Sequence, residues 1–253
     1  DVRRYKLIQP LFRGVDYCFH LAALPRVQYS IDHPDETNEV NVTGTLNVLR
    51  AALAAKVKKV IYASSSSVYG DQSVSSLAED LSAQPKSPYG LQKYIGELYC
   101  RIFSEVYGLP TVSLRYFNVY GPRQNPDGAY ALVIGKFLKQ RRLGEPLTIT
   151  GDGEQTCDFT HVKDVSKANL LAAMSNKVGR GEMINIGAGR NYSINKIAAL
   201  IGGSVKYIAS RLEPRDTLAD NRLAKKLLGW EPAILIEDGI ADLKRELLGQ
   251  NHE

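Results

Sequence analysis

"KVIYASSSSVYGD", residues 59–71, joins a strand-like apolar run directly to four consecutive serines. The apolar part, with its β-branched and aromatic residues, is typical of a buried strand. Serine is a poor strand former, and hydroxyl groups this close to a core need hydrogen-bonding partners. The stretch therefore predicts a strand that ends at Ser64–Ser67, and the function of these serines depends on what lies at that end.

Further strands and helices alternate on both sides of this stretch. "VDYCFHLAA" (15–23) and "LPTVSLRYFNVYGP" (109–122) read as strands. "ETNEVNVTGTLNVLRAALAAK" (36–56) has helical spacing, and "SPYGLQKYIGELYCRIFSEVYG" (87–108) predicts a long helix that ends at its glycine. This alternation predicts βαβ units around a parallel sheet. Ligands of such sheets bind at the carboxyl ends of the strands, so the serines are predicted to face the ligand crevice.

After Pro122 the alternation becomes less regular, with short strands and an amphipathic helical tail. We therefore predict an α/β fold, a doubly wound parallel sheet of Rossmann-like type with a smaller, interleaved C-terminal lobe. The sheet domain is predicted over 1–122 and about 155–190, and the lobe over 123–154 and 191–253.

Composition excludes several classes of protein. Of the 253 residues, 44% are apolar and 23% are charged, which is ordinary for a soluble globular protein. No apolar run has the length of a membrane span, and no signal-peptide pattern opens the chain. The net charge of +5 is mild and its basic pairs are scattered, so no nucleic-acid partner is expected. Three widely spaced cysteines suit a reducing compartment, the cytoplasm, and predict neither a disulfide framework nor a metal site.

Tyr89 and Lys93 lie four residues apart near the start of the predicted long helix, on one face. An ammonium beside a phenol favours the phenolate, so Lys93 is predicted to lower the pKa of Tyr89 and make it a general base. The Ser65 hydroxyl, from the neighbouring strand end, could bind the same substrate oxygen. The pair alone is a weak signal, because an interfacial tyrosine beside a solvated lysine gives the same pattern.

A series of motifs makes the signal specific. "FHLAA", "NVTGTLNVL", "SSSSVYGD", "SPYGLQK", "RYFNVYGPRQ", "GDGEQTCDFTHVKDV", "NIGAG" and "PRDTLADNRLAKKLLGW" occur in this order along almost the whole chain. The sequence resembles the extended short-chain dehydrogenase/reductase family, and within it the nucleotide-sugar 4-epimerases that act on UDP-glucose or UDP-N-acetylglucosamine. The resemblance implies NAD as cofactor, a dinucleotide-binding domain formed by the sheet and a nucleotide-sugar-binding lobe.

The resemblance also implies a role for each matching residue. The catalytic residues would be Ser65, Tyr89 and Lys93. The residues that contact NAD would be Asp1, Val2, Ala22, Ala23, Pro25, Asn41, Lys93 and Tyr116. The residues along the UDP-sugar would be Ser66, Asn118, Arg123, Thr148, Arg211 and Thr217. Asn118 has an equally simple explanation as a turn residue after a strand, and Ser64 and Ser67 are expected to bond to nearby backbone.

The reaction implied by the resemblance is a 4-epimerisation without net redox change. NAD takes a hydride from the sugar C4 while Tyr89 removes the O4 proton, the keto sugar rotates, and the hydride returns to its other face. Related dehydratases and decarboxylases carry an acid beside the catalytic Ser or Thr, whereas here no Asp or Glu follows Ser65 until Asp71. A reductase, an oxidoreductase that releases NAD(P)H and a catalytically silent binding protein on the same scaffold remain alternatives.

The sequence departs from the family pattern at three places. It has no glycine-rich dinucleotide fingerprint, so the chain is expected to lack the first two βα units of the sheet, about 60 residues. "SRLEPRDT" is shorter than the usual stretch around Arg211, which weakens that match. Cys157 stands where relatives carry an arginine for the UDP diphosphate.

Two further expectations come from the resemblance. Helices 36–56 and 87–107 have apolar residues beyond the need of one core face (Val40, Leu49, Leu98, Ile102 and Val106), and they are predicted to pair between two subunits of a homodimer. Thr217 aligns with a position where a large side chain narrows the sugar pocket, so a 2-acetamido sugar is expected to fit.

Overall fold

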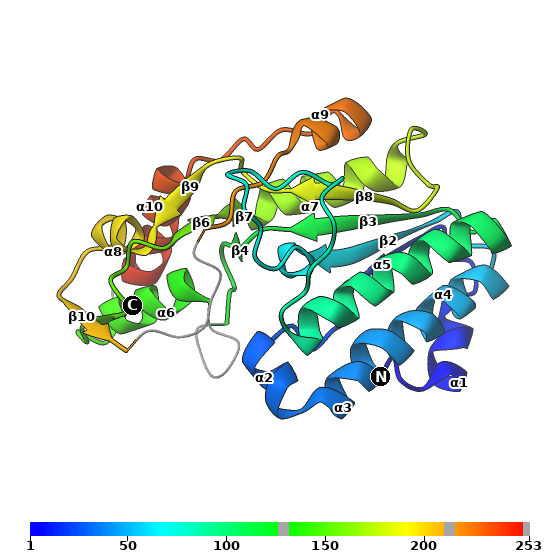
Figure 1. The fold of residues 1–253 in the computed structure, drawn as a ribbon, viewed down its shortest axis with the longest axis horizontal. Coiled ribbons are helices and arrows are strands. Elements are labelled where there is room, and N and C mark those ends of the chain that lie inside the picture. Colours follow the sequence, from blue (N-terminus) through cyan, green and yellow to red (C-terminus); the bar gives the residue numbers. More distant parts are fainter. Residues whose placement is uncertain (126–131, 210–215, 250–253) are drawn as a thin grey trace.

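In the computed structural model, which describes residues 1–125, 132–209 and 216–249, four strands form one parallel sheet in the order β1-β2-β3-β8 (Figure 1). The strands are β1 (Tyr17–His20), β2 (Lys59–Ser65), β3 (Thr111–Tyr116) and β8 (Glu182–Ile186). All pairings in this sheet are parallel. The parallel α/β fold predicted from the sequence is therefore confirmed.

Helices cover both faces of this sheet, because successive side chains of a strand point to opposite sides. Val60 and Tyr62 of β2 share a core cluster with residues of α4 (Gly44–Ala54) and α5 (Pro88–Tyr107). Ile61, between them, packs instead with residues of α7 (Val162–Met174) and α9 (Arg222–Leu228). Figure 1 shows α4 and α5 on one side of the sheet and α7 on the other. The sheet is doubly wound, as predicted.

The helix predicted over 36–56 is built in three pieces. It begins as α3 (Pro34–Asn38), continues as a π-helical turn over Glu39–Thr43, and ends as α4. A π-helical turn inserts one extra residue into the helix, and such turns are frequent at functional sites. Asn41, which the sequence places in the cofactor site, lies in this turn and is buried.

Helix α5 has the ends that its sequence predicts. Ser87 caps its start by accepting a hydrogen bond from the Gly90 N–H, and Pro88 occupies the first turn. Gly108, at φ +69°, ends the helix in the left-handed conformation that favours glycine. This 20-residue helix carries Tyr89 and Lys93 past the end of β2. Four shorter α-helices precede it in the described chain: α1 (Tyr5–Ile8), α2 (Val27–Asp32), α3 and α4.

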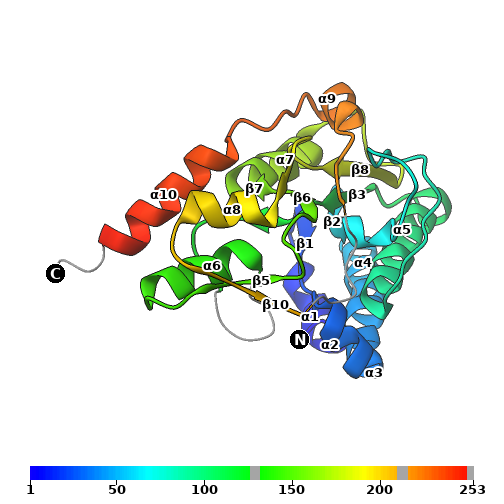
Figure 2. The same ribbon diagram turned by 60° about the vertical axis from the view of Figure 1, so that its left-hand side comes forward.

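A second group of elements lies beyond the carboxyl ends of the sheet strands (Figure 2). Its core is formed by residues of α6 (Val133–Arg142), α8 (Ile194–Ile201), α10 (Ile236–Gly249) and the strand β5 (Leu147–Thr150), which pairs in parallel with β10 (Val205–Ile208). Short strand pairs lie between this group and the sheet: β4 (Val119–Tyr120) with β7 (Thr160–His161), and β6 (Thr156–Asp158) with β9 (Asn191–Ser193).

The C-terminal part of the chain contributes to both groups. Ala224, Leu228 and Trp230 lie in the core cluster of the sheet, whereas Ile236, Ile240 and Leu243 lie in that of the second group. The division of the chain into a cofactor domain and a sugar lobe stays a prediction. Within the described ranges, every helix is too short or too polar to cross a membrane.

Candidate active site

Ser65 lies at the carboxyl end of β2, at the edge of the sheet where ligands of parallel sheets bind. Its pairing partner on β3 is Tyr116, so the two residues predicted for catalysis and for the cofactor are neighbours in register. The Ser65 hydroxyl accepts a hydrogen bond from the Ser67 N–H (3.1 Å) and so caps the 3₁₀ turn over Ser66–Val68. This cap fixes the direction in which the serine run leaves the strand.

Ser64 has a partner that the sequence analysis did not anticipate. Its hydroxyl donates to a carboxylate oxygen of Glu97 on α5 at 2.5 Å, and both residues are buried. The expectation that Ser64 bonds to nearby backbone is wrong, because the alternation of β2 turns Ser64 toward α5, on the same side as Tyr62. Ser67 bonds to Ser65 through both its N–H and its hydroxyl.

The first turn of α5 places Tyr89 beside the serine run. The Tyr89 N–H donates to the Ser30 hydroxyl at 3.0 Å, which ties this turn to α2. Gly90 allows close approach, since an added Cβ would lie 2.6 Å from the Ser67 carbonyl oxygen. Any larger residue at position 90 would push the helix start away from the serine turn.

Tyr89 is buried, and its phenol lies close enough to the Ser65 side chain to interact with it. Burial raises the pKa of the Tyr89 phenol to about 12, and the interaction with Ser65 acts in the opposite direction. The expectation that Lys93 lowers this pKa is wrong for the protein alone. The reason is that burial disfavours the phenolate more than the neighbouring groups stabilise it.

Lys93 is buried one turn after Tyr89. Its ammonium donates to the Ala63 carbonyl oxygen at 2.7 Å. The nitrogen lies 5.0 Å from the ring centroid of Tyr62 and 5.9 Å from that of Tyr89. Burial lowers the pKa of Lys93 to about 8, so this ammonium titrates close to neutral pH. Lys93 is therefore a buried residue bonded to the end of β2, and the alternative of a solvated surface lysine is excluded.

The loop after β1 is held in place by Asn41. The side-chain oxygen of Asn41 (Oδ1) accepts a hydrogen bond from the Leu24 N–H at 2.8 Å. Its side-chain nitrogen (Nδ2) donates to the Leu24 backbone carbonyl and to the side-chain oxygen of Gln92 on α5. Asn41 is thus buried beneath the loop and fixes its backbone. The predicted cofactor residues of this loop are only partly buried or exposed: Ala22, Ala23 and Pro25.

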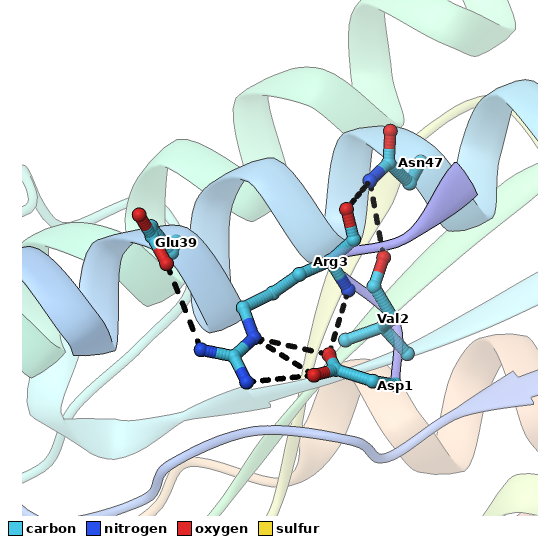
Figure 3. Close-up of polar contacts among 5 residues, drawn as sticks. All are labelled: Asp1, Val2, Arg3, Glu39 and Asn47. Carbon is cyan, nitrogen blue, oxygen red and sulfur yellow. Dashed lines mark hydrogen bonds and ion pairs between the residues drawn. The ribbon is translucent and has the colours of Figure 1, made fainter. Parts of the chain in front are cut away.

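Asp1 and Val2, which are predicted to meet the adenine, lie in a segment docked on α4 (Figure 3). The Asp1 carboxylate accepts from the Arg3 guanidinium at 2.6–3.1 Å, and Arg3 also approaches Glu39 at 3.6 Å. The Asn47 amide donates to the backbone carbonyls of Val2 and Arg3, each at 3.0 Å. These contacts fix the segment against the helix, and its contact with a cofactor stays a prediction.

Tyr116, at the end of β3, has its hydroxyl bonded to Asn169 of α7 at 2.8 Å. Burial raises the pKa of this phenol well above its usual value, against the effect of the Asn169 hydrogen bond. Tyr116 therefore stays neutral in the working pH range. Tyr116 pairs with Ser65 in the sheet, and its contact with a cofactor stays a prediction.

Two of the predicted substrate residues, Asn118 just after β3 and Thr217, lie in contact with each other. Asn118, in a positive-φ conformation (+26°), directs its amide toward the Asp158 carbonyl (3.1 Å) and the Thr217 hydroxyl (3.4 Å). The Thr217 hydroxyl also accepts from the Asp158 N–H at 3.4 Å. Ser66 is partly buried in its 3₁₀ turn, and Arg123 is exposed at φ +64°.

The remaining predicted substrate residues lie elsewhere in the second group of elements or outside the described residues. Thr148 lies on β5 with its N–H and hydroxyl bonded to the side chain of Gln140. Arg211 lies outside the described residues. Cys157, on β6 opposite Tyr192 of β9, packs against the core of the second group. Asn118 and Thr217 are thus in contact with each other, and their contact with a substrate stays a prediction.

Asp158, beside Thr217, is a buried carboxylate that sequence reasoning missed. Its fully buried carboxylate accepts from the N–H groups of Ala188 (2.7 Å), Gly189 (2.9 Å) and Ala219 (3.1 Å). Burial raises the pKa of Asp158 to about 6, and these backbone donors oppose the shift. The residue joins three of the quoted motifs, "CDF", "GAG" and "TLAD", next to Thr217. No group of three potential metal ligands occurs among the described residues.

Comparison with known proteins places this geometry in a family. The model of the "NAD dependent epimerase/dehydratase family" matches residues 1–187. The solved UDP-glucose 4-epimerase of Thermotoga maritima, in complex with UDP-glucose, is 35% identical with a TM-score of 0.92, over 100% of this chain and 84% of that chain. The UDP-glucuronic acid 4-epimerase of Bacillus cereus, in complex with UDP-glucuronic acid and NAD, is 35% identical with a TM-score of 0.87, over 99% of this chain and 80% of that chain.

A relative with a different printed activity is similar as well. A UDP-N-acetyl-alpha-D-glucosaminuronate decarboxylase of Bacillus cytotoxicus is 41% identical over 188 residues, which are 72% of this chain and 57% of that protein. Identity alone therefore does not separate 4-epimerases from decarboxylases for this chain.

Proposed function

The chain belongs to the NAD dependent epimerase/dehydratase family, and from that premise we propose that it inverts the C4 hydroxyl of a UDP-hexose with NAD as bound cofactor. The observation that carries the proposal is the cluster of buried Tyr89 and buried Lys93 at the start of α5, with the Lys93 nitrogen 5.9 Å from the Tyr89 ring centroid and Ser65 beside the phenol. The similarity to 4-epimerases that bind UDP-glucose or UDP-glucuronic acid supports a UDP-sugar as substrate.

The residues present fit the nicotinamide-ribose part of a dinucleotide, while the glycine-rich fingerprint that would hold its pyrophosphate is not in this sequence. Lys93 has three N–H donors, of which the Ala63 carbonyl accepts one, so the others can meet the hydroxyls of a ribose. The loop with Ala22, Ala23 and Pro25, fixed by Asn41, would pass along the cofactor, with Tyr116 beside it. When bound, oxidised NAD supplies a hydride acceptor for the sugar C4 and a second positive charge close to Tyr89.

The protein side chains handle the proton. Tyr89 would accept the O4 proton of the sugar as phenolate and give it back after inversion. Because the pKa of its phenol is about 12 in the protein alone, positive charge near the ring is needed to reach the phenolate at neutral pH. Lys93 provides one such charge at 5.9 Å from the ring centroid. Ser65 would orient the O4 hydroxyl through its own hydroxyl.

Asn118 and Thr217 would hold the sugar on the far side of the strand ends. The small side chain of Thr217 leaves space at the position that the sequence analysis assigns to sugar selection. We therefore propose that UDP-glucose and UDP-N-acetylglucosamine both fit, together with their 4-epimers.

A decarboxylase or dehydratase is the second candidate, favoured by the Bacillus cytotoxicus relative. Such chemistry needs an acid beside the catalytic serine. Within residues 1–125, 132–209 and 216–249, no carboxylate bonds to Ser65 or to Tyr89. Asp71, the first acid after the serine run, is exposed and pairs with Lys86 at 3.8 Å. The geometry therefore favours epimerisation.

The test is turnover with NAD and three substrates assayed separately: UDP-glucose, UDP-N-acetylglucosamine and UDP-glucuronic acid. An epimerase gives the 4-epimer of at least one, seen by chromatography, with no free NADH by absorbance. Carbon dioxide release from UDP-glucuronic acid would identify a decarboxylase, and NADH release an ordinary oxidoreductase. Binding of NAD and UDP without any turnover would support a silent binding protein and overturn the proposal.

A further inference from the structure

A buried carboxylate beneath the site contacts three of its structural elements. Glu97 is 0% exposed and lies on α5, one helical turn after Lys93. It accepts the Ser64 hydroxyl at 2.5 Å and the Arg115 guanidinium through Nε and Nη2, each at 2.8 Å. Ser64 immediately precedes Ser65 at the end of β2, and Arg115 immediately precedes Tyr116 at the end of β3. One side chain therefore joins α5 to both strand ends of the site.

The partner of this carboxylate is equally well held. Arg115 is 2% exposed, and its guanidinium lies 4.6 Å above the ring of Tyr69, the tyrosine of "SSSSVYGD". The Tyr69 hydroxyl contacts Asn185 of β8 at 2.7 Å. A buried ion pair of this kind is weak support for stability, because burying two charges costs about as much as their attraction returns. A bidentate pair does fix relative positions, since both hydrogen bonds have a narrow range of geometry.

Glu97 also acts on the charge of Lys93. The charged or titratable groups that face Lys93 come from the sheet and from α5: His20, Tyr62, Tyr89, Glu97 and Cys100. Cys100 and Glu97 raise the pKa of Lys93 against the larger effect of burial. Burial raises the pKa of the Cys100 thiol to about 12, so Cys100 is neutral near pH 8. The negative charge that acts on Lys93 at neutral pH is therefore that of Glu97.

We propose that Glu97 is a positioning residue of this active site: through Ser64 and Arg115 it fixes the strand ends of β2 and β3 against α5, with its carboxylate one helical turn after Lys93. The inference rests on the proposed function, because Lys93 matters to turnover only if Tyr89 and Lys93 are catalytic. Glu97 does not touch the substrate in this proposal. Its effect reaches the reaction through Ser65 and Lys93.

Two single substitutions separate the two effects. Glu97→Gln keeps the size and the oxygen acceptor but removes the charge, so Lys93 should lose its proton at lower pH. We expect kcat to fall about tenfold or more and the alkaline limb of kcat/KM to move about one pH unit toward acid. Ser64→Ala removes one hydrogen bond and no charge, so kcat should fall less while the alkaline limb stays in place.

Matched controls come from the same molecule. Glu182→Gln removes a carboxylate that accepts two backbone N–H groups at Gly179 and Arg180, away from the strand ends of the site. Ser104→Ala removes a hydroxyl of α5 that bonds to the Leu109 and Gly179 carbonyls. Neither variant should move the alkaline limb of kcat/KM. These controls show that a small loss of stability alone does not shift the pH profile.

Glu97→Gln leaves Arg115 buried without its counter-charge and could prevent folding. The double variant Glu97→Met/Arg115→Met removes both charges and keeps the volume, so its fold should survive. The direct measurement is an NMR titration of the Lys93 side chain, made on the double variant and on the wild type. The Lys93 signal is assigned by its loss in Lys93→Arg. A midpoint at lower pH than in the wild type supports the proposal, and an unchanged midpoint overturns it.

The NMR titration needs no turnover, so it remains decisive if the wild type shows no epimerase activity. That result would overturn the proposed function and leave the action of Glu97 on Lys93 open to the same measurement. If the wild type is active, a folded Glu97→Gln variant with wild-type kcat and an unmoved alkaline limb overturns the positioning role.

Discussion

At the scale of single residues, Tyr89 combines a reactive group with an environment that opposes its reaction. The phenol has to become a phenolate to accept a proton, yet burial raises its pKa to about 12. An enzyme can use this conflict, because a proton acceptor that is active only beside bound positive charge does no chemistry without its cofactor. The same burial lowers the pKa of Lys93 to about 8, so the two groups are shifted in opposite directions by one cause.

Tyr89→Phe tests the assignment of the proton acceptor. The ring keeps its packing, while loss of the hydroxyl removes the proton transfer, which is worth about 10²- to 10⁴-fold in rate. We expect epimerase kcat to fall by that factor while NAD affinity by calorimetry stays the same. Tyr94→Phe, on the same helix, serves as control and should keep its activity. A Tyr89→Phe variant with near wild-type turnover would contradict the assignment.

His20 makes a prediction about acid stability. It is buried, its Nε2 contacts the Thr45 hydroxyl at 2.9 Å, and burial with the charge of Lys93 lowers its pKa to about 3. Between pH 6.5 and 3 the unfolded chain therefore binds a proton that the folded protein does not, so stability falls as pH falls.

Between pH 7 and pH 5 the wild type should lose about 2 kcal/mol of its free energy of unfolding through His20. The His20→Gln variant should not show this loss, because it has no imidazole to protonate at this position. Urea denaturation at both pH values measures the difference. His33→Gln, at an exposed position, is the control and should follow the wild type at both pH values. Parallel behaviour of His20→Gln and wild type would show that His20 is not buried as a neutral ring.

Thr217 makes a prediction about substrate choice. Its hydroxyl lies 3.4 Å from the amide of Asn118, the other residue that is proposed to hold the sugar. We expect Thr217→Tyr to lose activity on UDP-N-acetylglucosamine while keeping much of it on UDP-glucose, because a large ring fills the space of the 2-acetamido group. Specificity constants for the two sugars give the answer. Thr217→Val, of similar size, should keep both activities; inactivity of the wild type on the N-acetyl sugar would refute the prediction.

At the scale of elements, the packing of α5 on β2 determines the position of the site. Gly96 lies where α5 crosses Tyr62, and an added Cβ would overlap atoms of the Tyr62 phenol ring. Tyr62 is 1% exposed, so its ring has no space to move into. This ring also lies 5.0 Å from the Lys93 nitrogen, so a shift of the helix would reach the site.

Gly96→Ala should therefore destabilise the protein, although alanine favours helix by about 1 kcal/mol over glycine. Overpacking costs about 1–3 kcal/mol, and we expect a net loss of about 1 kcal/mol or more with a lower kcat. Gly135→Ala in α6 is the matched control, since its Cβ would meet only the flexible Gln124 side chain at 3.2 Å. Equal stability of both variants in urea denaturation would contradict the argument.

The sequence predicted those elements whose signals are local. Helix α5 has its capping serine, its proline and its terminal glycine in the sequence itself, and β2 has a continuous apolar run. The π-helical turn over Glu39–Thr43 was not predicted, because its residues fit an ordinary helix and only the contacts of Asn41 favour the extra residue. The position of Ser65 at the carboxyl end of β2 followed from the parallel-sheet rule, and its catalytic role together with Tyr89 stays a prediction.

The polar network beneath the site could not be predicted, because its partners are distant in sequence. Arg115 is a charged residue within a buried strand, which signals that a partner exists but does not identify it. Glu97 repeats the spacing of Tyr89 and Lys93 on α5, and only the alternation of β2 and β3 shows that it meets Ser64 and Arg115. Lys59 is similar: it is buried and donates to the carbonyls at the end of α7, more than 100 residues away.

At the scale of the whole molecule, the surface of α5 carries an apolar stripe outside the core. Its members recur at helical spacing and are exposed or partly buried: Leu91, Ile95, Leu98, Ile102 and Val106. Ile102 is 43% exposed and Val106 is 65% exposed. Leu49 of α4, also expected at a subunit interface, is fully buried in the core between α4, α5 and the sheet, so that part of the expectation is wrong.

The remaining residues still favour a homodimer in which the α5 stripes of two subunits pack together, because a continuous apolar helix face loses contact with water on pairing. We expect a dimer by light scattering at micromolar concentration. Ile102→Glu places a charge in the centre of the stripe and should yield a monomer with unchanged circular dichroism. Leu143→Glu, 54% exposed after α6, is the control and should stay dimeric. If the wild type is a monomer, the stripe has another use; if Ile102→Glu still dimerises, the subunits meet through a different face.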